Sequence, residues 1–213
     1  MKAVVFDLDG TLLDTLEDLK DSVNAALTEY GVSERTIEEV RAFVGNGIRN
    51  LIIRSVPGGE THPDFENVFD FFKQHYRANC ANKTAPYEGI MELIEALSSR
   101  DIAMAIVSNK FDAGVKVLNE KFFAQYISVA LGELPGVKRK PDPETVVMAL
   151  QQLGVAPVDA IYVGDSDVDI VTARNAGLRS VVVTWGFRDE EFLLAQGAET
   201  IIRKPLELLE FLE

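Results

Sequence analysis

The fold is decided by the stretch AVVFDLDGT, which occupies residues 3–11. Its first four residues form a short apolar run rich in β-branched and aromatic side chains, which predicts a fully buried strand at residues 3–6. Side chains alternate faces along a strand, so Asp7 and Asp9 can point the same way while Leu8 packs behind them. Two neighbouring carboxylates at the end of a buried strand are costly unless a cation or a shared proton relieves them. These residues alone also fit a simple turn with no chemical role.

Similar apolar runs recur along the rest of the chain. They predict strands at residues 102–107, 127–131, 160–163, 180–183 and, more weakly, 200–202. Helical periodicity lies between them, at residues 88–99, 112–122, 143–153 and 167–176. Strands that alternate with helices indicate parallel pairing with right-handed crossovers. The expected fold is therefore a doubly wound α/β sheet, mainly parallel and Rossmann-like.

Residues 15–85 interrupt this alternation. They show helical periodicity at 16–30, 38–43, 48–55 and 64–79 and no convincing strand. The block follows the first predicted strand, whose carboxyl end is where ligands bind in open α/β sheets. We therefore expect a core domain of residues 1–14 and 86–213 and an inserted, all-helical cap domain of residues 15–85. A helical subdomain with no role in binding is the alternative.

Polar side chains follow three further predicted strands. Ser108 comes after the strand at 102–107, Lys140 precedes the helix at 143–153, and Asp165 and Asp169 follow the strand at 160–163. Each has an ordinary explanation, because serine often caps a helix, lysines often lie in solvated loops, and acids favour helix N-termini. However, the carboxyl ends of parallel strands meet at one edge, where carboxylates could bind a hard cation and Lys140 could neutralise an anion.

Composition restricts the partners. The 213 residues carry a formal net charge of −13, which disfavours nucleic acid and anionic membranes. Cys80 is the single cysteine, so the chain can form no internal disulfide. The sequence shows no signal peptide and no apolar run of membrane-spanning length. We expect a cytoplasmic protein, a monomer or a homodimer, that acts on a small molecule.

The order of these motifs resembles the haloacid dehalogenase superfamily of phosphohydrolases. The resemblance rests on the DxDGT motif of residues 7–11, then Ser108, then Lys140 before a proline, then Asp165 and Asp169, with a helical insert after the first motif. It covers essentially the whole chain. Finer matches, namely VGNG at residues 44–47, PYEG at 86–89 and SNK at 108–110, resemble the phosphoglycolate phosphatase subgroup.

The resemblance implies a mechanism and a set of site residues. Asp7 would be the nucleophile that forms an aspartyl-phosphate, and Asp9 the general acid and base. Mg²⁺ would be held by Asp7, Asp165 and the backbone carbonyl of Asp9, with Asp169 supporting the metal indirectly. The implied phosphate-binding residues are Gly10, Thr11, Ser108, Asn109 and Lys140. The implied substrate-binding residues of the cap are Gly45, Asn46, Gly47 and Arg49, although Arg49 fits a surface helix equally well.

Several related activities stay open. The activity that the resemblance favours is hydrolysis of a small phosphate monoester such as 2-phosphoglycolate, and the alternatives are a β-phosphoglucomutase-like enzyme or a pyrophosphatase of the same superfamily. A dehalogenase is disfavoured because such enzymes lack an acid at the position of Asp9. A non-enzymatic alternative is a Mg²⁺-dependent phosphoacceptor or regulatory module, such as a response-regulator receiver, although receivers carry no helical cap.

Overall fold

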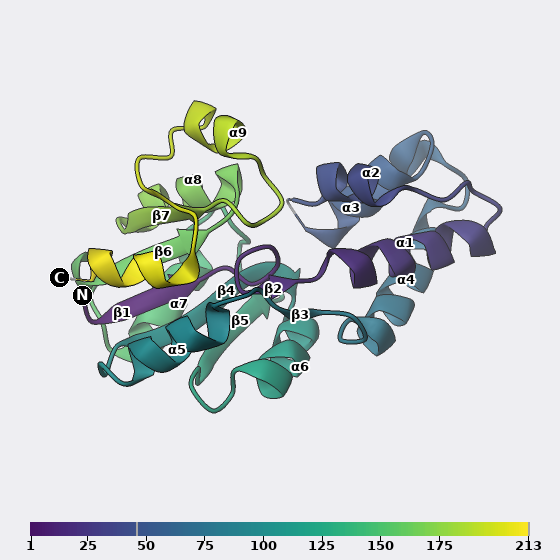
Figure 1. The fold of residues 1–213 in the computed structure, drawn as a ribbon. Coiled ribbons are helices and arrows are strands. Elements are labelled where there is room, and N and C mark those ends of the chain that lie inside the picture. The colour runs from purple at the N-terminus through teal and green to yellow at the C-terminus, as the bar shows by residue number, and fades with distance from the viewer. Residues whose placement is uncertain (46, 213) are drawn as a thin grey trace. The chain divides into compact units, whose positions relative to one another are not determined.

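The computed structural model describes residues 1–45 and 47–212, and it divides the chain into two compact units (Figure 1). The first unit, which we call the core unit, comprises Met1–Asp14 and Pro86–Glu213. The second, which we call the cap unit, comprises Thr15–Ala85. None of the helices among the described residues combines the length and the apolar character needed to cross a membrane.

The core unit is built on a six-stranded sheet in the order β5-β4-β1-β6-β7-β8. Every neighbouring pair of strands is parallel. The strands are β1 (Ala3–Phe6), β4 (Ala103–Phe111), β5 (Val129–Glu133), β6 (Ala160–Gly164), β7 (Arg179–Val183) and β8 (Ile201–Ile202). This topology confirms the predicted doubly wound, mainly parallel α/β fold. It also brings the carboxyl ends of all six strands to one edge of the sheet.

The central position of β1 explains its apolar sequence. Ala3 is in register with Ala103 of β4 on one side and with Ala160 of β6 on the other. All four β1 residues are at most 1% exposed. A strand that is covered on both faces and paired on both edges has no solvated side, so it reads as a continuous apolar run rather than an alternating one.

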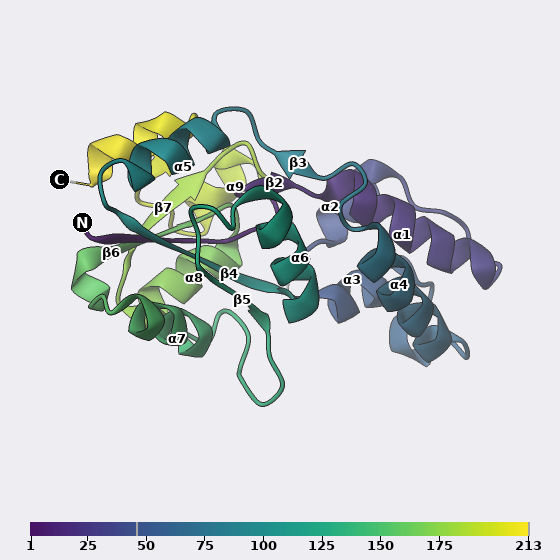
Figure 2. The same cartoon turned by 90° about the horizontal axis from the view of Figure 1, so that it is seen from below.

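Helices cover both faces of this sheet. In Figure 2, α5 (Ile90–Ser98) lies with the 3-10 helix η3 (Pro205–Phe211) on one side, and α7 (Glu144–Leu153) and α8 (Asp167–Ala176) lie on the other. The remaining core helices are α6 (Asp112–Phe122), α9 (Glu190–Ala195) and the 3-10 helix η2 (Pro157–Asp159). The sequence patterns predicted α5 to α8 but neither α9 nor η3, which are short.

Two strand features differ from the prediction. The strand expected at residues 102–107 continues to Phe111, with a register shift against β5 between Val107 and Phe111. Such a bulge extends a strand while it turns side chains in new directions. The structure also adds a two-stranded sheet of β2 (Leu13–Asp14) and β3 (Ala85–Pro86), whose two-residue strands leave no periodicity to detect.

The cap unit consists of α1 (Leu16–Glu29), α2 (Ile37–Phe43), α3 (Ile48–Ser55), the 3-10 helix η1 (Gly59–Thr61) and α4 (Phe65–Asn79). The helical character agrees with the sequence pattern. Its two ends are tied together by the buried carboxylate of Asp18. This carboxylate accepts hydrogen bonds from the amides of Lys83 and Thr84 at 3.0 and 2.9 Å and from the Thr84 hydroxyl at 2.8 Å. The amides it satisfies lie at the point where the chain leaves the unit.

Candidate active site

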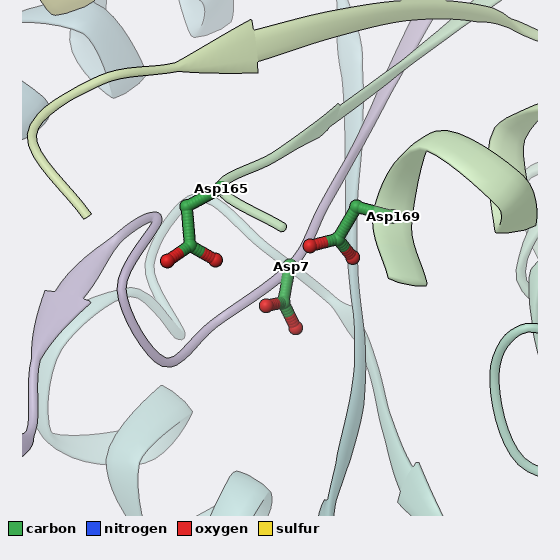
Figure 3. Close-up of side chains that lie close together, drawn as sticks. All are labelled: Asp7, Asp165 and Asp169. Carbon is green, nitrogen blue, oxygen red and sulfur yellow. The ribbon is translucent and has the colours of Figure 1, made fainter. Parts of the chain in front are cut away.

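Three buried carboxylates meet at the carboxyl edge of the sheet (Figure 3). Asp7 directly follows β1, Asp165 directly follows β6, and Asp169 lies in the first turn of α8. One oxygen from each lies within 4.8 Å of the others. The three residues are at most 8% exposed. The structure therefore brings together the acids that the sequence placed at two separate strand ends.

The Lys140 ammonium group lies among these acids. Its Nζ donates to Oδ1 of Asp7 and to Oδ1 of Asp169, both at 2.8 Å, and to the Tyr162 hydroxyl at 3.0 Å. Burial lowers the pKa of Lys140, but Asp169 and Asp7 outweigh burial and hold that pKa well above its usual value. Lys140 is therefore a permanent cation that faces Asp7. This is the position expected of a group that would neutralise the carboxylate of the implied nucleophile.

One ammonium does not balance three buried carboxylates. Burial raises the pKa of Asp7 to about 7, although Lys140 opposes it, and the neighbouring Asp169 adds to the rise. Burial and the charges of Asp169 and Asp7 likewise hold the pKa of Asp165 well above its usual value. Carboxylates that resist ionisation in this way are short of positive charge. Hard oxygen donors that lie close together and lack a counter-charge fit a divalent cation such as Mg²⁺.

The loop after β7 fixes Asp165. The Phe187 amide donates to Oδ2 of Asp165 at 2.7 Å. Gly186 lets this loop approach, because a Cβ there would collide with the Asp165 carboxylate. Gly10 packs against the same carboxylate and has φ of +87°, a conformation that favours glycine. The sequence gives no signal for Gly186. Phe187 follows the strand predicted at residues 180–183, and its sequence position favours core packing over a place at the edge of the site.

Asp169 belongs to the N-terminal cap of α8. It forms a capping box with Ser166, whose amide and hydroxyl donate to Oδ2 at 3.1 and 2.5 Å. Its Oδ1 accepts from Lys140 and from the Tyr162 hydroxyl at 2.9 Å. Four donors thus occupy this carboxylate, which suits the indirect support expected of Asp169 better than direct metal binding. Sequence reasoning missed Tyr162, which lies on β6 and looked like an ordinary core residue.

Asp9 is held by a different lysine. Lys110 Nζ lies 3.0 Å from Oδ1 and 3.3 Å from Oδ2 of Asp9. The Lys110 side chain is 1% exposed, whereas the Asp9 side chain is 18% exposed. The carboxylate predicted to exchange protons with substrate therefore keeps partial access to solvent on the edge of the sheet. In the sequence, Lys110 stands out only as the last residue of the SNK motif.

The bulge of β4 carries Ser108 and Asn109. Ser108 is 5% exposed, and its hydroxyl accepts from the Lys110 amide at 3.2 Å. The Asn109 side chain accepts from the Lys140 amide at 2.9 Å and donates to the Lys140 carbonyl at 3.0 Å. Both ends of the Asn109 amide thus hold the Lys140 backbone, which positions Lys140. The phosphate contact of Asn109 stays a prediction.

The turn after Asp9 uses its amides internally. Gly10 donates to the Leu13 carbonyl at 2.9 Å and Thr11 to the Leu8 carbonyl at 3.3 Å, so these amides close the turn. The Thr11 hydroxyl is different, because it is buried and has no hydrogen-bond partner among the described residues. A buried hydroxyl without a partner is costly, which makes this oxygen a candidate donor to a bound anion.

The candidate cap residues divide into two groups. Arg49 is engaged by Glu60 at 2.8 Å and by Glu66 at 2.5 Å, and its guanidinium lies 5.0 Å from the centre of the Phe65 ring. These contacts are those of a residue that holds the cap helices together, so they favour the surface-helix interpretation of Arg49. Gly45 and Gly47 have φ of +127° and +85°. Asn46 lies outside the described residues, and the substrate role of this loop stays a prediction.

Comparison with known proteins agrees with this geometry. The sequence matches the haloacid dehalogenase-like hydrolase family over residues 4–183. A phosphoglycolate phosphatase from Aquifex aeolicus is 30% identical, over 100% of this chain and 97% of the relative. An N-acetylmuramic acid 6-phosphate phosphatase from Pseudomonas aeruginosa is 31% identical, over 100% of this chain and 95% of the relative. A solved structure from Lactobacillus delbrueckii subsp. bulgaricus, 34% identical, superposes with a TM-score of 0.93 and covers 99% of this chain and 98% of its own.

The family match and the phosphatase relatives identify the chain as a hydrolase, and its doubly wound sheet carries buried carboxylates at the carboxyl ends of parallel strands. The chain belongs to the haloacid dehalogenase-like hydrolase family. Within that family it is an enzyme of the phosphatase type, similar to phosphoglycolate phosphatases along its whole length.

Proposed function

We propose that this enzyme is a Mg²⁺-dependent phosphatase that hydrolyses a small phosphate monoester through an aspartyl-phosphate on Asp7. The observation that carries the proposal is the surroundings of Asp7. Its carboxylate is 8% exposed at the end of β1, accepts from the Lys140 ammonium, and lies with Asp165 and Asp169 in a cluster whose negative charge this one ammonium does not balance. A carboxylate nucleophile needs to be oriented and ionised. Lys140 orients Asp7 and favours its ionised form, and a bound Mg²⁺ would supply the remaining positive charge.

The chemistry proceeds in two displacements. In the first, an oxygen of Asp7 forms a bond to phosphorus, the bond from phosphorus to the substrate oxygen breaks, and the proton carried by Asp9 passes to that oxygen. In the second, Asp9 takes a proton from water, and the water oxygen displaces the Asp7 carboxylate from phosphorus. The products are an alcohol and inorganic phosphate, and both aspartates return to their first state.

Six groups of this chain would hold the phosphoryl oxygens or the metal. The Lys140 ammonium and the hydroxyls of Ser108 and Thr11 are the donors available to phosphate. Asp7, Asp165 and the backbone carbonyl of Asp9 would hold Mg²⁺. When bound, the metal would neutralise charge on the phosphoryl oxygens and on the nucleophile, which is the main electrostatic requirement of phosphoryl transfer.

The substrate proposal starts from the relatives. The names of two similar enzymes specify phosphoglycolate and N-acetylmuramic acid 6-phosphate, and both compounds are phosphate esters that also carry a carboxylate. We therefore propose a carboxylate-bearing phosphate monoester as the substrate class, with 2-phosphoglycolate as the first candidate and a larger sugar acid phosphate as the second.

A matched pair of esters tests the substrate class. We expect kcat/KM for 2-phosphoglycolate to exceed that for 2-hydroxyethyl phosphate by about tenfold or more, because one paired charge is worth about 1.4 kcal/mol or more in a specific site. The measurement is phosphate release with Mg²⁺ from a panel that adds N-acetylmuramic acid 6-phosphate, a hexose phosphate, a nucleotide and pyrophosphate. A preference for pyrophosphate, or conversion of one hexose phosphate into another, would favour the alternative activities. Equal rates for the matched pair would contradict the substrate class.

The metal proposal predicts how Mg²⁺ stabilisation depends on pH. The folded-state pKa of Asp7 is raised from 3.8 to about 7, so ionising Asp7 costs stability as pH rises through about 7 in the metal-free protein. Mg²⁺ binds the ionised form and competes with protons. We therefore expect Mg²⁺ to raise Tm more at about pH 8 than at about pH 5.5. The shift should disappear in Asp165→Asn and persist in Asp159→Asn, an exposed acid of the same unit. An equal shift at both pH values would contradict the assignment.

A further inference from the structure

Lys110 makes a contact that neither the motif comparison nor the proposed mechanism uses. Its ammonium lies within 3.3 Å of both oxygens of Asp9, the residue proposed to transfer protons. We propose that Lys110 is a positioning residue, which fixes the direction of the Asp9 carboxyl group for proton transfer to the leaving oxygen. This inference rests on the proposed function, because it gives a role to a neighbour of the same site.

The turn that contains Asp9 fixes the backbone of this residue but not the orientation of its side chain. Asp9 forms an isolated bridge with Leu13, and the following residue, Gly10, donates to the Leu13 carbonyl at 2.9 Å. The tight turn therefore sets where the side chain starts. It does not set the two side-chain torsions, which decide where the carboxyl oxygens point. A donor that meets both oxygens restricts both torsions at once.

The position of Lys110 is fixed by the backbone of the neighbouring strand β4. Lys110 lies in the bulge of β4, and its amide donates to the Ser108 hydroxyl at 3.2 Å. The residue is 3% exposed, so its long side chain is enclosed and does not sample solvent. A buried ammonium requires an anionic or polar partner, and Asp9 provides one. Both partners of the pair thus project from rigid backbone at neighbouring strand ends, where bulges commonly direct side chains into sites.

Substrates with different leaving groups can show whether Lys110 positions Asp9 or only stabilises the fold. An alkyl phosphate has a poor leaving oxygen that needs a proton as its bond breaks, so its rate depends on a well-placed Asp9. The oxygen of p-nitrophenyl phosphate leaves readily without that proton. If Lys110 orients Asp9, its loss should affect the alkyl ester far more than the aryl ester. If Lys110 only stabilises the fold, both esters should be affected alike.

The experiment compares wild type and Lys110→Met with two substrates, the best alkyl phosphate of the panel and p-nitrophenyl phosphate, at saturating Mg²⁺. We expect kcat/KM to fall about 10- to 100-fold for the alkyl ester and about threefold for the aryl ester, since general acid catalysis contributes about 10²- to 10⁴-fold. Asp9→Asn should show the same selectivity.

Adding Lys110→Met to Asp9→Asn should cause little further loss, because the two residues act as one unit. Lys2→Met removes an exposed lysine–aspartate pair of the same unit and should change neither rate.

The outcomes separate the two proposals. If wild type hydrolyses neither ester, the proposed function fails and this inference fails with it. If wild type is active but Lys110→Met lowers both esters equally, or its effect simply multiplies with that of Asp9→Asn, the positioning role alone is wrong. Should Lys110→Met fail to fold, Lys110→Gln supplies the same test, because its amide is shorter, uncharged and unable to meet both Asp9 oxygens. The same selectivity is then expected, and its absence would overturn the inference.

Discussion

Asp7→Asn is expected to abolish turnover while leaving the protein folded. Loss of a nucleophile that acts together with its neighbours typically costs on the order of 10⁴-fold or more in kcat. Asparagine has almost the same shape as aspartate, but its amide cannot form the acyl phosphate. The measurement is phosphate release from the best substrate with saturating Mg²⁺, and the control is Asp159→Asn, which removes an exposed acid of the same unit and should keep full activity.

The Asp7→Asn substitution that abolishes turnover should not lower the stability of the metal-free protein at high pH. In the metal-free wild type, burial raises the pKa of Asp7 from 3.8 to about 7, so the folded state loses stability as pH rises from 3.8 to about 7 and carries the full penalty above that range. The asparagine side chain of the Asp7→Asn variant carries no charge, and Lys140 keeps its contact with Asp169. We therefore expect the Tm of the metal-free variant at about pH 8 to equal or exceed that of wild type. Residues of an active site often lower the stability of the folded protein in this way. Retained turnover in Asp7→Asn would rule out Asp7 as the nucleophile.

The positions of Asp7, Asp165 and Lys140 were predictable because they depend on the direction of the strands and not on individual side-chain contacts. Asp7 and Asp165 each come directly after a short apolar strand, and parallel strands end at one edge of the sheet. The expectation of parallel strands was enough to place both carboxylates at the same edge of the sheet. The same reasoning placed Lys140 near them, because it precedes the helix that returns to the sheet.

The contacts that orient these residues were not predictable. Phe187 reaches Asp165 through a backbone amide, which any residue type can supply, so no side-chain pattern marks it. Lys110 reaches Asp9 because β4 runs past its expected end through a bulge, and periodicity does not reveal bulges. Arg49 is a residue for which the sequence leaves two interpretations open, ligand binding beside a glycine loop and a surface helix, and its contacts with Glu60 and Glu66 favour the second.

Lys140→Met should cause the second large loss, in both activity and stability. Lys140 is the ammonium that faces Asp7 and Asp169, and its side chain is 4% exposed. Removing one partner of a buried ion pair commonly costs about 3–5 kcal/mol, because the remaining charge is left uncompensated. For a chain of this size the expected fall in Tm is roughly 10 °C. Turnover should fall about 10³-fold or more, because the phosphoryl oxygens and the nucleophile lose the same cation.

The pH dependence of this loss identifies its cause. Burial raises the pKa of Asp7 and Lys140 opposes that rise, so in Lys140→Met the pKa of Asp7 should move above about 7. A group whose folded-state pKa is raised loses stability as pH increases through that pKa, and near pH 5.5 the protonated carboxyl needs no cation. The destabilisation should therefore be larger at about pH 8 than at about pH 5.5. Adding Asp7→Asn to Lys140→Met should restore part of the stability at about pH 8, because it removes one uncompensated carboxylate, but none of the activity. If the loss of Tm does not change with pH, Lys140 contributes through packing, and charge compensation at Asp7 is not its role.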